Sequence, residues 1–348
     1  MHYYLYKLKF TTPVHFGADV AGIGVEKCSP TCHADTFFSA LCQEILYLHG
    51  EKELNRWANL VDENKFLLSD LFPYYGEYLY LPKPVMPRKK VEIEDETSEL
   101  DARQNKKLMK KLKFIPVKYW EQFIEYINAE RDTFDPREDE SFYKEVIYPK
   151  VSITRTEEKN DLYSVGAYVY QNKIIDENNS NNNKEQAGLY FVIYIDDVNK
   201  EAFDKILKSL QFSGIGGERS SGFGKFEIHK VFKLGTGSKC DMEETLYSLI
   251  INADSKKYKM SLSVISPDSK DLNHLEEAYY TLIPRKGFIA SSTYSDTPVK
   301  RQPVVMFNTG SCFTKRLNGN LLDLRSEEDR KINNHKVYRY GKAIMVGI

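Results

Sequence analysis

The sequence contains few cysteines, and their spacing is irregular. Five cysteines among 348 residues are typical of reduced thiols rather than of a disulfide-stabilised secreted domain. A zinc site could be drawn from Cys28, Cys32 and His33 with Cys42 beyond them, but the spacing is poor and Cys42 falls within an apparent helix. We therefore interpret the cysteines as buried or surface thiols and predict no metal and no cofactor. The five are Cys28, Cys32, Cys42, Cys240 and Cys312.

The sequence also lacks an apolar run long enough to cross a bilayer, and its first ten residues lack the apolar core and cleavage site of a signal peptide. We expect a cytoplasmic protein with no membrane partner. An excess of one charge is missing too, because 49 Lys and Arg stand against 50 Asp and Glu, for a net charge of −1. No basic field covers the whole molecule, so binding to nucleic acid would depend on local patches.

Glycine is concentrated in residues 212–226, which read Phe-Ser-Gly-Ile-Gly-Gly-Glu-Arg-Ser-Ser-Gly-Phe-Gly-Lys-Phe. Glycine permits a positive φ and lets another molecule approach the main chain closely, at an entropic cost. The five glycines surround Arg219, Ser220 and Ser221. Exposed N–H groups, a guanidinium and two hydroxyls suit the oxygens of a phosphate backbone. This stretch, which we call the glycine loop, is therefore predicted to bind phosphates.

The neighbours of the glycine loop exclude two familiar phosphate-binding motifs. A P-loop needs a Lys-Ser/Thr pair that opens a helix, and none is present. A dinucleotide-binding loop follows a strand and precedes a helix. Here residues 201–211 have the apolar spacing of a helix and residues 223–230 alternate like a strand, so the order is reversed. The remaining alternative is a helix C-cap with an ordinary turn, which needs only one or two glycines.

The rest of the first 238 residues predicts two β-α-β units separated by an insertion. A strand is expected over residues 3–10, then a helix with Asp35 as N-cap that runs to Gly50, and a strand over residues 66–72. After an insertion at about residues 78–187, a buried strand over 189–195 precedes the helix, the glycine loop and the last strand. This order predicts an α+β fold in which residues 1–238 form a ferredoxin-like domain, as in RNA-recognition modules.

The insertion contains two segments with a recognisable pattern. Residues 151–155 and 162–170 read as the two arms of a hairpin with its tip at 156–161. Residues 106–113 are rich in lysine, which fits either a solvated helix face or a contact with RNA or a partner.

A second domain, residues 239–348, is predicted from further strands over 258–265, 279–283, 303–307 and 337–346. Between two of these strands, residues 284–301 carry Arg285, Lys286, Lys300 and Arg301 against a single acid, Asp296. This is the most distinct basic patch in the sequence. It is predicted to contact either RNA or a neighbouring protein subunit.

Four stretches together resemble the RAMP superfamily of CRISPR effector proteins, and more narrowly the subunit of the type III-A Csm complex that caps the 5′ end of the guide RNA. They are His15-Phe-Gly17, Ala34-Asp-Thr-Phe-Phe-Ser-Ala-Leu41, residues 213–226 of the glycine loop, and Gly310-Ser-Cys-Phe313 with Tyr338-Arg-Tyr-Gly341. The glycine stretch is diagnostic of the superfamily, and the C-terminal pair narrows the resemblance to this subunit. One departure is Glu218, where the family often carries a basic residue.

The resemblance implies two ferredoxin-like (RRM-like) domains, a thumb-like hairpin from the insertion, and a protein without nuclease activity. It implies three partners: the repeat-derived 5′ tag of the guide RNA, the large palm-domain subunit, and the backbone RAMP subunits. No catalytic residue is predicted. Arg155 is expected to meet the guide where the tag ends. The predicted RNA-binding residues are His15, Phe16, Gly17, Arg155, Gly214, Ile215, Gly216, Gly217, Arg219, Ser220, Ser221, Gly222, Phe223, Arg285, Lys286, Lys300 and Arg301.

Two functions of other classes stay open at this point. The first is a metal-independent endoribonuclease that processes repeat RNA, which needs a general base and acid near the 2′-OH and the leaving oxygen. His15 and His33 are the histidines in the early loops, and they lie far apart in sequence. The second is an enzyme acting on a small phosphate compound, or a pure interaction scaffold. His15 could also have a purely structural role.

Overall fold

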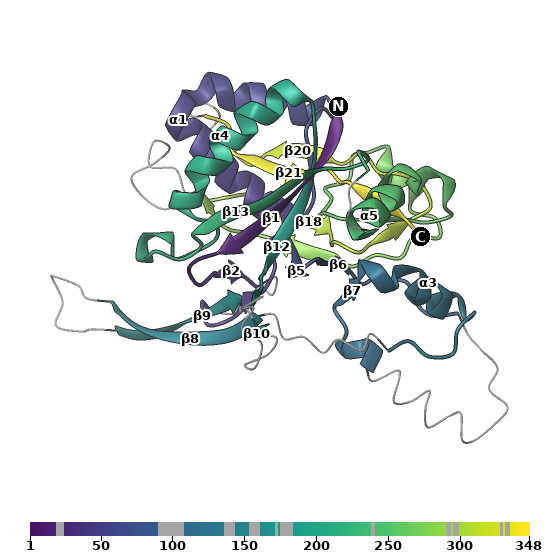
Figure 1. Ribbon diagram of the computed structural model, residues 1–348. Coiled ribbons are helices and arrows are strands. Elements are labelled where there is room, and N and C mark those ends of the chain that lie inside the picture. Colours follow the sequence, from purple (N-terminus) through teal and green to yellow (C-terminus); the bar gives the residue numbers. More distant parts are fainter. Residues whose placement is uncertain are drawn as a thin grey trace.

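An antiparallel sheet of seven strands forms the centre of the first half of the chain (Figure 1). The computed structural model describes residues 1–18, 24–89, 108–135, 143–152, 161–170, 173–174, 184–237, 241–289, 294, 299–327, 330 and 335–348. The strand order is β13-β1-β12-β5-β6-β7, and β4 pairs with β12 beside β5. The strands are β1 (His2–Phe10), β4 (Leu67–Leu68), β5 (Phe72–Tyr75), β6 (Tyr78–Pro82), β7 (Phe114–Pro116), β12 (Ala187–Ile195) and β13 (Phe226–Lys233).

Two long helices cover one face of this sheet (Figure 1). They are α1 (Ala34–Asp62) and α4 (Asp197–Ser213), so the chain order is β1-α1-β5, then the insertion, then β12-α4-β13. Alternate side chains of β1, such as Tyr6 and Leu8, pack against the helices in one core. The predicted order of two β-α-β units around an insertion is therefore present, and it places the glycine loop between α4 and β13.

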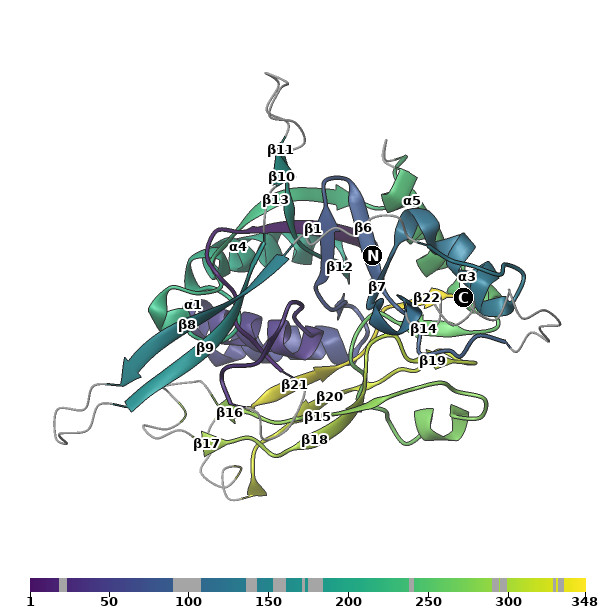
Figure 2. The same ribbon diagram turned by 90° about the horizontal axis from the view of Figure 1, so that it is seen from below.

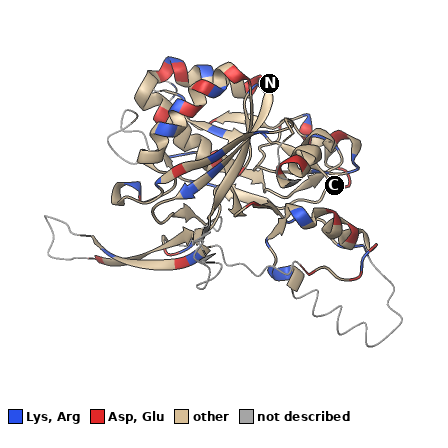
Figure 3. Ribbon diagram, in the orientation of Figure 1, with Lys and Arg blue, Asp and Glu red and all other residues tan. Residues whose placement is uncertain are grey.

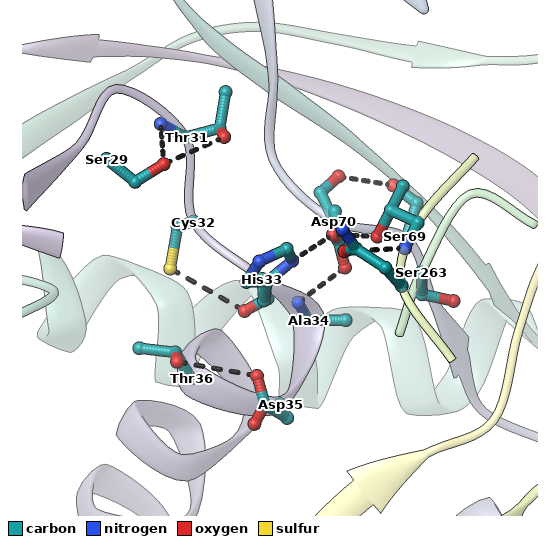
Figure 4. A network of polar contacts seen from close by, with 12 residues as sticks. Ser29, Thr31, Cys32, His33, Ala34, Asp35, Thr36, Ser69, Asp70 and Ser263 are labelled. Atoms are coloured by element: carbon teal, nitrogen blue, oxygen red, sulfur yellow. Dashed lines mark hydrogen bonds and ion pairs between the residues drawn. The ribbon is translucent and has the colours of Figure 1, made fainter. Parts of the chain in front are cut away.

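The start of α1 differs from the prediction. The N-cap is His33 rather than Asp35, and the carboxylate of Asp70 accepts a hydrogen bond from the Ala34 N–H at 2.7 Å and contacts His33 Nδ1 at 2.6 Å (Figure 4). Asp35 cannot cap the helix because its carboxylate is paired with two arginines, described below. Gly50, with φ +77°, interrupts α1 rather than ending it.

The predicted strand over residues 66–72 is divided into β4 and β5. Between them, the Asp70 N–H donates to the Leu262 carbonyl at 2.7 Å, while the Asp70 side chain binds the start of α1. These contacts draw the main chain away from the sheet at Asp70, whereas the Ser69 N–H still donates to the Val192 carbonyl of β12 at 2.9 Å. Asp70 therefore separates the two strands.

The opposite face of the sheet is covered by the insertion and by the second half of the chain. Lys7 of β1 is 0% exposed, and its Nζ lies 3.3 Å from an oxygen of Glu243, which is equally buried. Glu243 belongs to α5 (Asp241–Ile251). Leu5 and Tyr190 share a core with Met260 and Val346, so the predicted boundary near residue 239 does not separate two independent cores.

The insertion contains a long hairpin that extends away from the sheet (Figures 1 and 2). Strands β8 (Tyr143–Ser152) and β9 (Asp161–Tyr170) pair from Tyr143↔Tyr170 to Ser152↔Asp161. The predicted hairpin is thus present and begins eight residues earlier than expected. Its tip and Arg155 lie outside the described residues, as do residues 106 and 107 of the lysine-rich segment.

The remaining elements of the first half are short. They are β2 (Phe16–Gly17) paired with β3 (Cys28–Ser29), β10 (Lys173–Ile174) paired with β11 (Lys184–Glu185), α3 (Trp120–Asn128), and the 3-10 turns Val117–Tyr119 and Arg219–Ser221.

In the second half, the strands form several short ladders. Strand β14 lies between β19 and β22, and separate pairs join β15 to β18, β16 to β17 and β20 to β21. None of the described helices is long and apolar enough to cross a membrane. The strands are β14 (Lys259–Ser261), β15 (Leu282–Arg285), β16 (Phe288–Ile289), β17 (Val299–Lys300), β18 (Val304–Phe307), β19 (Cys312–Phe313), β20 (Asn320–Asp323), β21 (Tyr338–Gly341) and β22 (Met345–Gly347), with 3-10 turns at Ala253–Ser255 and Asp271–His274.

Strand β21 joins the second half to α1 (Figure 2). Tyr340 is fully buried, its ring lies 5.3 Å from that of Phe38, and its hydroxyl accepts a hydrogen bond from the Leu68 N–H at 2.7 Å. Arg339, the residue before it, donates a hydrogen bond to Asp35 in the first turn of α1. The two halves of the chain therefore meet at the N-terminal part of this helix.

Candidate functional site

The glycine loop is closed by hydrogen bonds within the chain itself. The Ile215 N–H donates to the Gly224 carbonyl at 3.0 Å, the Gly217 N–H to His15 O at 2.8 Å, and the Gly224 N–H to Pro13 O at 2.8 Å. Seven N–H groups of the loop donate in this way, those of residues 214, 215, 217, 221, 222, 223 and 224. The prediction that the loop offers a row of free N–H groups to phosphates is therefore wrong for these seven positions.

The glycines instead allow three segments to pack closely. Gly224 has φ +77°, and a Cβ there would lie 2.1 Å from the Ile215 carbonyl oxygen. A Cβ on Gly216, at φ +98°, would lie 2.5 Å from His15 O. Gly214, at φ +78°, is the C-cap position of α4. The alternative of a simple helix cap thus explains Gly214, and contact with the loop after β1 explains Gly216 and Gly217. Gly224 instead packs against Ile215 within the loop, and a Cβ on Gly222, at φ +87°, would meet nothing within 4 Å.

The side chains of the glycine loop divide into a buried and an accessible group. Ile215 and Phe223 are core residues, and Phe223 packs with Val165 and Ala167 of the hairpin. Arg219 donates from Nη2 to Gln43 Oε1 at 2.6 Å, and burial lowers the pKa of its guanidinium. Two hydroxyls, those of Ser220 and Ser221, belong to exposed residues.

The segment after β1 links the glycine loop to the hairpin. His15 is buried, and its Nδ1 is 2.7 Å from the Gly166 carbonyl oxygen of β9. Phe16 is buried against Phe10 with ring centroids 6.2 Å apart, while Gly17 is exposed. His15 is consequently fixed by the hairpin on one side and by the glycine loop on the other.

An ion pair adds a second link between hairpin and loop. The Lys150 ammonium of β8 contacts the carboxylate of Glu218, donates to Ser221 Oγ at 2.9 Å, and lies 5.0 Å from the ring centroid of Phe223. The hydrogen bond from Lys150 lowers the pKa of Glu218. The acidic residue at this position of the loop is therefore neutralised by a lysine from the insertion.

The basic residues of the second half are divided between the interior and the surface. Arg285 forms two hydrogen bonds to Asp35, from Nε at 2.9 Å and from Nη2 at 2.8 Å. Arg339 also donates to Asp35, and Arg301 donates from Nη2 to Ser39 Oγ at 3.0 Å. Lys286 and Lys300 are exposed. The predicted patch of four is thus two inward-facing arginines and two surface lysines.

The charges of this cluster shift the protonation equilibria of its members. Burial alone would raise the pKa of Asp35, but Arg285 and Arg339 outweigh it and hold this pKa well below its usual range. Burial and the neighbouring Arg339 lower the pKa of Arg301 to about 10. Asp35 is consequently ionised, and the arginines exceed their counter-charge.

These residues line one cleft of about 460 Å³. It contains five basic side chains and one acidic side chain, which gives it a formal charge of +4 in a chain of net charge −1. Figure 3 shows that on the outer helices, in contrast, both signs are mixed. The lining residues are His15, Gly17, Asp35, Thr36, Ser39, Ala40, Gln43, Gly216, Gly217, Arg219, Arg285, Lys286, Gly287, Phe288, Arg301 and Arg339.

The cleft brings together eight of the predicted RNA-binding residues: His15, Gly17, Gly216, Gly217, Arg219, Arg285, Lys286 and Arg301. Sequence reasoning missed Ser39, Gln43 and Phe288. It also missed Arg339, although a charged residue within an otherwise apolar strand was a signal that could have identified it. Within the described residues, no group of three or more His, Cys, Asp or Glu could hold a metal ion.

Two protein-family models match this chain. A model of the RAMP superfamily matches residues 7–227, so this chain belongs to the RAMP superfamily. A model of the CRISPR Csm4 C-terminal domain matches residues 254–348. The resemblance predicted from the sequence is therefore confirmed.

Similar proteins and structures extend over the whole chain. The CRISPR system Cms protein Csm4 of Mycobacterium tuberculosis H37Rv is 28% identical over 339 residues, covering 96% of this chain and 94% of that protein. The Csm4 protein of Streptococcus thermophilus is 27% identical, covering 99% and 98%. The crystal structure of the Csm3-Csm4 subcomplex of the type III-A CRISPR-Cas interference complex is 18% identical with a TM-score of 0.63, covering 100% and 99%. The Csm1-Csm4 cassette with AMPPNP, 18% identical, gives 0.54, covering 100% and 98%. The α+β RAMP fold is thus established for this chain.

Proposed function

We propose that this protein is a non-enzymatic RNA-binding subunit of a type III-A CRISPR complex and that its cleft holds the repeat-derived 5′ tag of the guide RNA. The observation that carries the proposal is the composition of the cleft. Each of the four stretches that carry the family resemblance contributes to its lining, and the cleft is positively charged while the chain is not. A local basic groove suits a nucleic-acid backbone.

The chemistry of the cleft fits single-stranded RNA. Guanidinium groups bind phosphate oxygens in a bidentate manner, and unstacked bases can lie on aromatic rings. Arg219 of the glycine loop and Arg301 of the second half provide guanidinium groups. Phe288, which is 53% exposed, provides an aromatic ring at the rim of the cleft. Sequence reading of the target would then come from base pairing, with the protein fixing the guide by its backbone.

The finer features of the fold belong to the same proposal. The order β13-β1-β12-β5, with α1 and α4 on one face, supports a ferredoxin-like first domain. A ferredoxin-like second domain stays a prediction. The hairpin of β8 and β9 would act as the thumb, with Arg155 at the end of the tag and Lys300 on the surface of the second half.

The proposed partners are the large palm-domain subunit and the backbone RAMP subunits. Support comes from the similar structures, in which Csm4 proteins occur in a Csm1-Csm4 cassette and a Csm3-Csm4 subcomplex. Assembly in a guide-bound complex would place the protein in the cytoplasm.

The endoribonuclease alternative is less well supported by the cleft. Within the described residues His15 is the one histidine of its lining, and its Nδ1 is already bonded to a backbone carbonyl. His33 lies on Asp70 outside the cleft. Incubation of the isolated protein with repeat RNA tests this directly. We expect intact RNA, and cleavage that disappears in His15→Ala would establish the nuclease instead.

The experiment that tests the proposed function is recovery of RNA with the complex. The tagged protein is purified from its host at low salt, and the associated RNA is sequenced from its 5′ end. We expect short RNAs with one common repeat-derived 5′ end, together with the other subunits. Arg219→Ala is expected to lose guide as salt rises, whereas Arg316→Ala, an exposed arginine paired with Asp254 outside the cleft, is expected to retain it. The absence of any enriched RNA would refute the proposal.

A further inference from the structure

Helix α1 presents three polar side chains to the cleft at a regular interval. Asp35, Ser39 and Gln43 are each four residues apart, so they occupy one face on successive turns. At a rise of 1.5 Å per residue, the row from the first to the third spans about 12 Å. The apolar residues of the same helix face the sheet core.

Each of these three side chains holds guanidinium groups from another part of the chain. Asp35 binds Arg285 and Arg339, Ser39 binds Arg301 at 3.0 Å, and Gln43 binds Arg219 at 2.6 Å. The first three arginines come from the second half of the chain and the fourth from the glycine loop. Four guanidinium groups are thereby arranged along one helix face, with one carboxylate among them.

Two of the four arginines, Arg301 and Arg339, have unused hydrogen-bonding capacity. Arg339 is 4% exposed, and Nε of both Arg339 and Arg301 is buried with no hydrogen-bond partner among the described residues. A buried donor without a partner, and a buried positive charge in excess, are both costly. An anion in the cleft would offset the excess positive charge, since oxyanions accept several charge-assisted hydrogen bonds at once.

We infer that this row on α1 sets the register of the RNA: Asp35, Ser39 and Gln43 position the four arginines so that they bind consecutive phosphates of one single strand. The inference rests on the proposed function and deepens it. A stacked strand advances about 3.4 Å per nucleotide, so the 12 Å row spans roughly three to four nucleotide steps. The strand would run along α1 from the glycine loop to the second half of the chain, and Ser39 and Gln43 are positioning residues that need not touch it.

An acidic protein segment is the other class of ligand that a row of arginines attracts. A single strand of RNA is favoured because its charges recur at short, regular intervals, as the arginines do along the helix turns. Competition by polyglutamate, measured beside the RNA titrations, separates the two. Binding of polyglutamate without binding of RNA would overturn the inference.

The test measures binding of the full-length protein to a fluorescent synthetic RNA that copies the 5′ end of the guide recovered with the complex. We expect Arg219→Ala to weaken binding about 10-fold and to reduce the salt dependence, d log K/d log [salt], by about 0.7, as for one lost phosphate contact on a single strand. Gln43→Ala should weaken binding about 3- to 10-fold with an unchanged salt slope, because no charge is lost. Gln122→Ala, an exposed glutamine on α3, is the matched control and should bind like wild type.

Double variants separate positioning from general damage to the fold. The effect of Gln43→Ala should vanish when Arg219 is already alanine, and the effect of Ser39→Ala should vanish when Arg301 is alanine. The fold-changes in affinity caused by Gln43→Ala and Arg301→Ala should multiply in the double variant. If the losses of affinity multiply in the pairs Gln43/Arg219 and Ser39/Arg301, or if Gln43→Ala does not change affinity, the side chains on α1 do not position the arginines. The proposed function would be unaffected by that result. Failure of the wild-type protein to bind the RNA would refute both.

Discussion

The two walls of the cleft are built in opposite ways. On the glycine-loop wall, the N–H groups of Gly217 and Gly224 are bonded to the loop after β1, and close backbone contacts leave little space for an added side chain. The wall from the second half consists of side chains: hydrogen bonds to α1 hold Arg285, Arg301 and Arg339. Its stability depends on how these positive charges are balanced. The first wall should therefore be sensitive to an added methyl group and the second to a lost charge.

The largest effect is expected where charge is removed. Asp35→Asn leaves Arg285 and Arg339 without their counter-charge, and breaking a buried pair in this way costs about 3–5 kcal/mol. The measurement is the free energy of unfolding by urea at neutral pH. Because the folded-state pKa of Asp35 is depressed, its contribution is present above the unfolded pKa of about 3.9 and is lost as pH falls through the folded value.

The control for this variant is Asp254→Asn, which removes an exposed carboxylate paired with Arg316. It should change the free energy of unfolding by less than about 1 kcal/mol. Equal free energies of unfolding for Asp35→Asn and wild type would contradict the view that the arginine wall depends on its counter-charge.

A smaller effect is expected where volume is added to the other wall. Gly224→Ala and Gly222→Ala both place alanine at a positive φ, which costs about 1–2 kcal/mol. Only Gly224 has a backbone oxygen, that of Ile215, in the path of the new Cβ. We expect Gly224→Ala to lose about 1–3 kcal/mol more than Gly222→Ala, measured by urea unfolding. Equal losses would show that the positive φ alone accounts for the need for glycine at these two positions.

Arg301 allows the charge of the second wall to be removed by pH. Its pKa of about 10 means that it is charged at neutral pH and loses its charge as pH rises through that value. Affinity for oligoadenylate should therefore fall between about pH 9 and 11 more steeply in wild type than in Arg301→Gln. Parallel pH profiles of the two proteins would exclude a role for this group.

The smallest effect concerns the ion pair that joins hairpin and loop. Glu218→Gln removes the carboxylate that holds Lys150, which leaves one more cation for the RNA. We expect affinity to rise a few-fold and the salt slope to steepen by about 0.7, while the free energy of unfolding changes by about 1 kcal/mol at most. Weaker binding with an unchanged slope would mean that the pair serves only to hold the loop.

The features that the sequence predicted depend on local patterns. The order α4, glycine loop, β13 and the pairing of β8 with β9 follow from apolar periodicity and glycine spacing. The contacts of Asp35 could not be predicted in this way, because Arg285 and Arg339 are 250 and 304 residues distant in the chain. The same limit explains part of the error about the loop, since the N–H groups of Gly217 and Gly224 bond to the distant carbonyls of His15 and Pro13. The other five N–H groups bond to carbonyls of residues 210–224.

The most direct test of the proposed site is photo-crosslinking within the assembled complex. A benzophenone amino acid replaces Phe288 at the rim of the cleft or, as control, the exposed Val198 on the first turn of α4 outside it. The guide nucleotides that become attached are then mapped. Crosslinks from position 288 to the repeat-derived 5′ nucleotides, and none from position 198, are the predicted result. Crosslinks from position 288 to spacer nucleotides, or to protein subunits alone, would contradict the assignment of the cleft to the tag.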